Sequence, residues 1–254
     1  MSAATDTYLL LRAFVDELAR CGLRDACTSP GSRCAPLVLS LTREPRLRCH
    51  SHIDERCAGF FAVGLAKSSG RPVAVTCTSG TAAAELLPAA IEAHEAGVPL
   101  LILTADRPPE LRENGAGQTI DQIKLYGSAA KWFFEVGVQE QSEAGLRWMR
   151  TLACRAYWRA LEGRPGVVHL NFPLREPLTG DGEPLPPDET GRPESAPYVR
   201  RPAARLHAPD ATAELSALIA SRTRGVVVAG RSERTTPAAA AAEFCAAARW
   251  PLLA

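Results

Sequence analysis

The chain contains 254 residues, of which 46% are hydrophobic and 22% are charged. This composition is typical of one or two globular domains with a substantial core. The formal net charge is +1 and no run of lysine or arginine stands out, which argues against a protein built to bind nucleic acid or a membrane surface.

The N-terminal segment and the cysteines bear on the cellular setting. Charged residues interrupt the first apolar run at Arg12 and Asp16, so neither a signal peptide nor a membrane span is expected there. The eight cysteines have no CxxC or ladder-like spacing, and most lie within apolar segments, where free cysteine behaves as a small hydrophobic residue. We therefore expect a cytoplasmic protein with reduced thiols and no metal site built from cysteine or histidine.

Predicted helices and strands alternate through the first 172 residues. The first helix begins after the cap cluster Thr5-Asp6-Thr7 and ends near Gly22. A loop over 110–122 is expected to enter a short helix through Lys124. Apolar spacing predicts strands at 23–28, from 47 towards 54, 73–77, 98–104, 131–136 and 167–172, and helices at 36–41, from 55 onward, 81–96 and 141–161. Such alternation predicts an α/β fold, a parallel sheet flanked by helices.

Composition changes at Pro173 and divides the chain. We expect an N-terminal domain over 1–172, a proline-rich linker or extended strap over 173–208, and the start of a second α/β domain over 209–254. The last segment offers a helix, a strand, an alanine-rich helix and the first residues of another strand. Two strands do not make an independent α/β domain, so we expect the chain to stop inside one.

Several polar residues follow predicted strands, where ligands bind in open α/β sheets. Glu55 begins a helix directly after a strand; it is either a chemical group or a helix-start residue beside the cap Asp54. The Thr78-Ser-Gly-Thr81 turn can bind a ligand through its backbone or serve as an ordinary cap. Two arginines, Arg33 and Arg107, suit a carboxylate, although a loop arginine is commonly just solvated.

Two glutamines and two histidines have open interpretations, and the absence of three motifs disfavours three classes of protein. Gln118 and Gln122 are either amide contacts or exposed loop residues, and His50 and His52 are expected to pack or face solvent. The chain lacks the GxGxxG, GxxxxGK[ST] and GxSxG motifs, which disfavours dinucleotide binding, a phosphate-binding P-loop and a serine hydrolase. A lone carboxylate with few other titratable groups fits chemistry carried by an organic cofactor.

Five motifs, taken in order, carry a family resemblance. They are Ser29-Pro-Gly-Ser-Arg33, Asp54-Glu-Arg56 with Gly59-Phe-Phe61, Thr78-Ser-Gly-Thr-Ala82, Leu103-Thr-Ala-Asp-Arg-Pro-Pro-Glu-Leu111 and Gly115-Ala-Gly-Gln-Thr-Ile-Asp-Gln122. Together they resemble the N-terminal domain of 2-succinyl-5-enolpyruvyl-6-hydroxy-3-cyclohexene-1-carboxylate synthases, thiamine-diphosphate-dependent transferases of menaquinone biosynthesis. The resemblance runs from about Thr7 to Phe172, and the segment from Pro209 resembles the opening of the family's middle domain.

The resemblance implies a reaction and a set of site residues. Family members decarboxylate 2-oxoglutarate and add the succinyl unit to isochorismate. Glu55 would be catalytic, by hydrogen bonding to the aminopyrimidine ring of the cofactor and so promoting loss of the thiazolium proton. The other implied residues are Thr81 and Gln118 at the cofactor and Ser32, Arg33 and Arg107 at the substrate. No metal ligand is expected in this chain.

The resemblance also implies what the chain alone does not supply. The family binds the diphosphate and Mg²⁺ through a C-terminal domain that is absent here, and a homodimer or homotetramer completes the site, so this chain alone is expected to be inactive. At Glu85 the family usually has asparagine, which puts a nearby polar contact in doubt. The alternatives are a non-catalytic or regulatory module that binds a carboxylate metabolite, and another thiamine-dependent carboligase.

Overall fold

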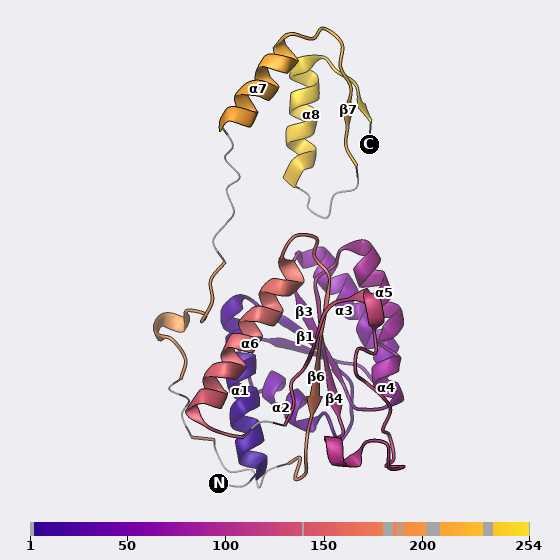
Figure 1. Ribbon diagram of the computed structural model, residues 1–254, viewed down its shortest axis with the longest axis vertical. Coiled ribbons are helices and arrows are strands. Elements are labelled where there is room, and N and C mark those ends of the chain that lie inside the picture. Colours follow the sequence, from indigo (N-terminus) through magenta and orange to yellow (C-terminus); the bar gives the residue numbers. More distant parts are fainter. Residues whose placement is uncertain are drawn as a thin grey trace. The chain divides into compact units, whose positions relative to one another are not determined.

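The computed structural model describes residues 3–138, 140–179, 185–186, 188, 190–201, 209–230 and 236–253 (Figure 1). The chain divides into two compact units between Arg200 and Arg201. None of the helices in the described residues combines the length and apolar character that crossing a lipid bilayer requires.

A parallel sheet forms the centre of the first unit. Within its described residues, six strands pair in the order β2-β1-β3-β4-β6-β5, and every pairing is parallel. This confirms the predicted α/β fold. The strands are β1 (Asp25–Thr28), β2 (Arg48–Ser51), β3 (Val73–Cys77), β4 (Leu100–Asp106), β5 (Ala130–Glu135) and β6 (Val167–Pro173).

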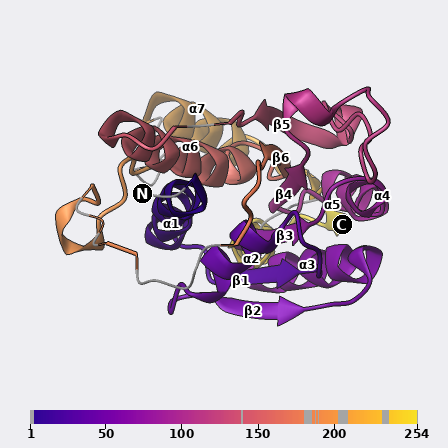
Figure 2. The same ribbon diagram turned by 90° about the horizontal axis from the view of Figure 1, so that it is seen from below.

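Helices cover both faces of this sheet (Figure 2). One face packs against α1 (Ala3–Cys21), α2 (Ala35–Thr42) and α6 (Glu143–Leu161), and the other against α3 (Glu55–Ser69) and α5 (Leu87–Ala96). Alternate residues of β4 enter the two cores, with Leu101 and Leu103 on the first face and Leu100 and Ile102 on the second. The near-continuous apolar run of this strand follows from burial on both sides.

Three predicted helices differ from the structure. The first was expected to begin after the cap cluster Thr5-Asp6-Thr7, but α1 begins at Ala3, so these residues lie within the helix and do not precede it. The helix expected over 81–96 is broken into α4 (Thr81–Ala84) and α5. Pro88 lies in the first turn of α5, and because proline has no backbone N–H it does not continue the helix that precedes it. The short helix expected through Lys124 is wrong: that residue lies in a turn with φ 54°, in the left-handed region.

The proline-rich segment is partly described. Residues 180–184, 187, 189 and 202–208 of the predicted linker lie outside the described residues. The described part lies along α1 and α6 as an extended strap: the Trp158 indole donates to the Val199 carbonyl at 2.8 Å, and the Tyr8 hydroxyl donates to the Leu178 carbonyl at 3.0 Å. The boundaries drawn at 172 and 208 stay a prediction, while the compact division falls at Arg200.

The second unit has a short α/β pattern. Its described residues contain α7 (Pro209–Ala220), β7 (Val227–Val228), α8 (Thr236–Ala248) and β8 (Leu252–Leu253), and the two strands pair in parallel. Apolar side chains on these elements stay exposed, Val228 by 71% and Leu253 by 57%. Two short strands leave this apolar surface uncovered by a further layer within the described residues.

Candidate active site at the carboxyl ends of four strands

The sequence-predicted residues follow four strands that are neighbours in the sheet. Glu55 follows β2, Ser32 and Arg33 follow β1, Thr81 follows β3, and Arg107 follows β4. Since β2, β1, β3 and β4 lie side by side in this order and run in parallel, all these loops leave from one edge of the sheet. Gln118 reaches the same edge from the loop after β4, where its backbone lies against Gly80.

Glu55 is the first residue of α3. The helix cap is supplied by Asp54, whose carboxylate accepts the Cys57 N–H at 2.8 Å, so capping does not engage Glu55. The Glu55 side chain is half-buried and has no hydrogen bond or ion pair within the described residues. Burial, with the Glu55 carboxylate as a further cause, raises the pKa of Cys34 to about 11. This carboxylate therefore lies near the start of α2, and it also raises the pKa of Cys77 at the end of β3, after burial and Cys34.

The loops after β1 and β3 touch one another through glycine. A side-chain carbon at Gly31 would lie 2.4 Å from the Thr78 Cβ, so only glycine allows this approach. Gly80 has φ 84° and ψ −143°, and its N–H donates to the buried Gln122 amide oxygen at 2.9 Å. The exposed side chains of Thr81 and Glu85 follow this turn.

Gly80→Ala is expected to destabilise the first unit by about 1–3 kcal/mol, because the new methyl group meets the Gln118 backbone at 3.1 Å in a conformation that favours glycine. The midpoint of urea unfolding measures this loss. The control is Gly117→Ala on the same loop, where nothing lies within 4 Å; a loss as large in the control would contradict the assignment.

Two arginines lie close together at this carboxyl-terminal edge of the sheet, which is called the rim below. Both already have hydrogen-bond partners. Arg33 is 5% exposed, donates to the Leu174 carbonyl at 2.9 Å and pairs with Glu176 at 3.1 Å. Arg107 donates to the Ser79 hydroxyl. Burial first, and the charge of Arg33 second, lower the pKa of Arg107. Ser32 is exposed beside them. Two neighbouring guanidinium groups suit a carboxylate-bearing ligand, although Glu176 already pairs with Arg33.

A buried polar network supports this edge of the sheet. Asn171 donates to Asp106 at 2.9 Å and to Glu135 at 2.7 Å, and Arg112 pairs with both carboxylates. Gln122 completes the network by donating to the Asn171 amide oxygen at 2.9 Å and to the Ala105 carbonyl at 3.1 Å. A satisfied buried network of this kind makes the loop geometry rigid.

Sequence reasoning missed most of this network. Gln122 was expected to contact a ligand or be exposed, whereas it is 1% exposed and bonded on both sides of its amide. The signal that points to the network is a pair of polar residues two apart on each of two apolar strands: Thr104 and Asp106, then His169 and Asn171. Burial lowers the pKa of His169 to about 3, so this ring is neutral at pH 7.

The fold and this rim define a class of protein. Residues 10–125 match the family described as thiamine pyrophosphate enzyme, N-terminal TPP binding domain, which spans β1 to β4 and every loop that carries a candidate residue. The first unit is thus a thiamine-pyrophosphate-binding domain.

Comparison with curated proteins gives the particular family. The chain is 55% identical over 179 residues to the 2-succinyl-5-enolpyruvyl-6-hydroxy-3-cyclohexene-1-carboxylate synthase of Thermobifida fusca (70% of this chain, 32% of that protein). It is 49% identical over 233 residues to that of Roseiflexus castenholzii (87% and 40%), and 45% identical over 242 residues to that of Geobacillus kaustophilus (95% and 42%). The chain belongs to this synthase family, and it spans about a third to two-fifths of the length of these relatives.

Proposed function

We propose that this chain supplies the pyrimidine-side part of the cofactor site in a longer thiamine-diphosphate-dependent synthase that decarboxylates 2-oxoglutarate and adds the succinyl unit to isochorismate. The observation that carries the proposal is Glu55, a half-buried carboxylate without a partner in the described residues, at an edge where arginine and glycine loops converge. The names of the relatives supply the product of the synthase, and the family resemblance of the five sequence motifs supplies its two substrates.

The residues at the rim fit half of such a cofactor. A carboxylate that is not spent on capping can share a proton with a pyrimidine ring nitrogen, and the close-packed glycine loops let a flat ring approach the backbone. The chemistry that the cofactor supplies when bound is a thiazolium carbon that adds to a 2-oxo acid and takes up the electron pair left by carbon dioxide. The only cluster with metal-ligand geometry in the described residues, Glu17 with Cys21 and Cys154, is not part of the rim.

The proposal assigns some parts of the site to this chain and the other parts to the rest of the synthase. Glu55 would hold the pyrimidine proton, and Thr81 and Gln118 would border the ring. Ser32, Arg33 and Arg107 would orient the substrate carboxylates, with Arg107 held by the Ser79 hydroxyl. We propose that Mg²⁺ and the diphosphate are held by a C-terminal domain, that a homodimer or homotetramer joins the two halves, and that the enzyme works in the cytoplasm.

The test is turnover of the full-length synthase in the presence of thiamine diphosphate and Mg²⁺. Release of carbon dioxide from 2-oxoglutarate and consumption of isochorismate should both require the cofactor. Preference for pyruvate over 2-oxoglutarate would favour another carboligase instead. Absence of any cofactor-dependent turnover would contradict the proposal.

A second candidate is a non-catalytic module that binds a carboxylate metabolite through Arg33 and Arg107. The closeness of the two guanidinium groups favours it. Arg33, however, already bonds to Glu176 and to the Leu174 carbonyl, which leaves less of its fork for a ligand. Calorimetric titration of this chain with 2-oxoglutarate and with isochorismate distinguishes the two candidate functions. Saturable binding without the rest of the synthase supports the non-catalytic module.

A further inference from the structure

A cavity of about 260 Å³ lies on the α1 and α2 face of the first unit, apart from the candidate active site. Helix α1 contributes Tyr8 and Arg12 to its lining, and the connection after α2 contributes Arg43 and Pro45. Leu185, from the described part of the strap, closes one side. None of the candidate active-site residues lines it, so the cavity calls for its own explanation.

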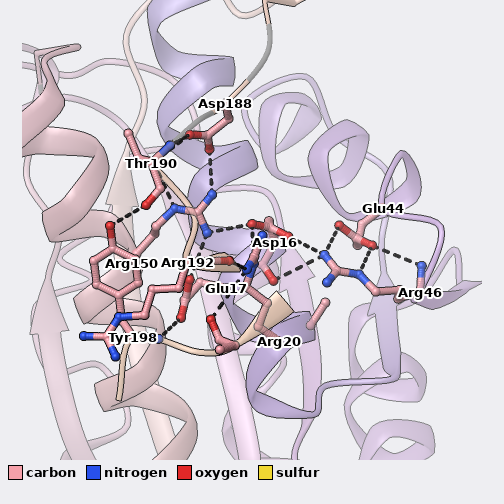
Figure 3. Close-up of polar contacts among 12 residues, drawn as sticks. Asp16, Glu17, Arg20, Glu44, Arg46, Arg150, Asp188, Thr190, Arg192 and Tyr198 are labelled. Atoms are coloured by element: carbon pink, nitrogen blue, oxygen red, sulfur yellow. Dashed lines mark hydrogen bonds and ion pairs between the residues drawn. The ribbon is translucent and has the colours of Figure 1, made fainter. Parts of the chain in front are cut away.

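Among the described residues, the carboxylates around this cavity bond to arginines other than those that line it. Figure 3 shows their contacts: Asp16 with Arg20, Arg46 and Arg150, Glu17 and Asp188 with Arg150, and Glu44 with Arg46. Glu44 also lines the cavity, but both of its oxygens accept from the Arg46 guanidinium, at 2.6 and 2.8 Å. At bonding distance these carboxylates are therefore paired, while at longer range the charges of Asp188 and Asp16 raise the pKa of Arg12 against the larger effect of burial.

Two arginines that line the cavity have no carboxylate at bonding distance within the described residues. Arg12 and Arg43 form no ion pair or side-chain hydrogen bond with any described residue, and the Arg12 Nε atom is buried without a hydrogen-bond acceptor. Burial is the largest cause that lowers the pKa of Arg12. The Arg43 guanidinium lies 5.6 Å from the centre of the Tyr8 ring. No hydrogen bond within the described residues engages the terminal guanidinium nitrogens of either arginine, so an anion in the cavity would supply acceptors for them.

We propose that this cavity is a binding site for a small carboxylate carried on a single aromatic ring, held by Arg12 and Arg43. The planar guanidinium fork matches a carboxylate, and Val15, Pro45 and Leu185 provide apolar walls for the ring beside Tyr8. A cavity of about 150 Å³ accommodates one benzene ring, so the volume here leaves room for a ring with its carboxylate. A bare phosphate would fill only the charged end.

The probe is benzoate, titrated into the 254-residue chain and followed by amide chemical shifts. Saturable binding with a Kd of about 1 mM or tighter is expected for a ligand of this size. The shifts should centre on α1 and the end of α2. Benzamide, which has the same shape without the charge, should bind at least about tenfold more weakly because the charge-assisted bonds are lost. Failure of wild-type chain to bind benzoate saturably would overturn the proposal.

Variants locate the binding. Arg12→Gln and Arg43→Gln should each weaken benzoate binding about tenfold or more, while Arg71→Gln, at an exposed turn, should leave the Kd unchanged. Retained thermal unfolding temperatures show that the variants fold. Loss of binding in Arg107→Gln instead would place benzoate at the strand-end rim, and equal binding of inorganic phosphate would show a plain anion site; either result overturns the proposal. Neither outcome bears on the proposed synthase activity.

Discussion

Glu55→Gln in the full-length synthase is expected to lower kcat at least about 100-fold, the usual contribution of a group that transfers or holds a proton in the rate-determining chemistry. Glutamine has nearly the same shape but does not share a proton with a pyrimidine nitrogen in the way a carboxyl group does. The KM for 2-oxoglutarate should change little, because in the proposed site the substrate carboxylates contact arginine. Carbon dioxide release under saturating cofactor measures the effect.

The structure makes this variant a clean test. Asp54 caps α3, and Glu55 has no hydrogen bond or ion pair in the described residues, so the amide removes no contact that holds the fold. Thermal unfolding should match that of the unchanged protein. Glu92→Gln, an exposed carboxylate on α5, is the matched control and should retain full turnover. A kcat within a few-fold of the unchanged enzyme would remove Glu55 from the proposed chemistry.

Arg150→Leu is expected to cost about 3–5 kcal/mol of the free energy of unfolding, because removing one partner of a buried ion pair leaves the other charge unpaired. Arg150 is 1% exposed and pairs with Glu17, which is 0% exposed, at 2.8 Å. It also joins α6 to Asp16 on α1 and to Asp188 on the strap (Figure 3). Burial works to lower the pKa of Arg150, but its hydrogen bonds to Asp16 and Glu17 and the charges of Asp188 and Asp16 together outweigh this and raise it.

Urea unfolding of the 254-residue chain measures this loss. Arg147→Leu is the matched control: it lies one turn earlier on α6, is exposed, and pairs only with exposed Glu143. An exposed pair of this kind contributes at most about 0.5 kcal/mol. Limited proteolysis of the strap should also become faster in Arg150→Leu, since Thr190 and Asp188 lose their bonds to the guanidinium. Equal stabilities of the two variants would show that the cluster does not hold α1, α6 and the strap together.

Local sequence patterns were sufficient for most of the first unit. Apolar runs bounded by glycine and proline located the strands, as at 73–77, because burial on both faces selects β-branched and aliphatic residues there. The break at Pro88 was missed although the residue was visible, because alanine-rich spacing on both sides suggested one helix. The turn at Lys124 was missed because buried Gln122, which bonds to Gly80 and Asn171, determines the path of that loop.

By itself, the sequence determined the α/β class, the synthase family and the loops that carry Glu55 and the two rim arginines, because strand periodicity, turn residues and motifs are local properties of the chain. Only the tertiary structure showed which loops are neighbours, that Arg33 is already bonded to Glu176, and that Arg12 lines a cavity without a hydrogen bond or ion pair to any described residue. These facts depend on contacts between residues that are far apart in the chain. The Arg150–Asp16 pair is another example, because its two residues are 134 positions apart in the sequence. Packing of the sheet and helices brings such residues together, and no local spacing encodes that encounter.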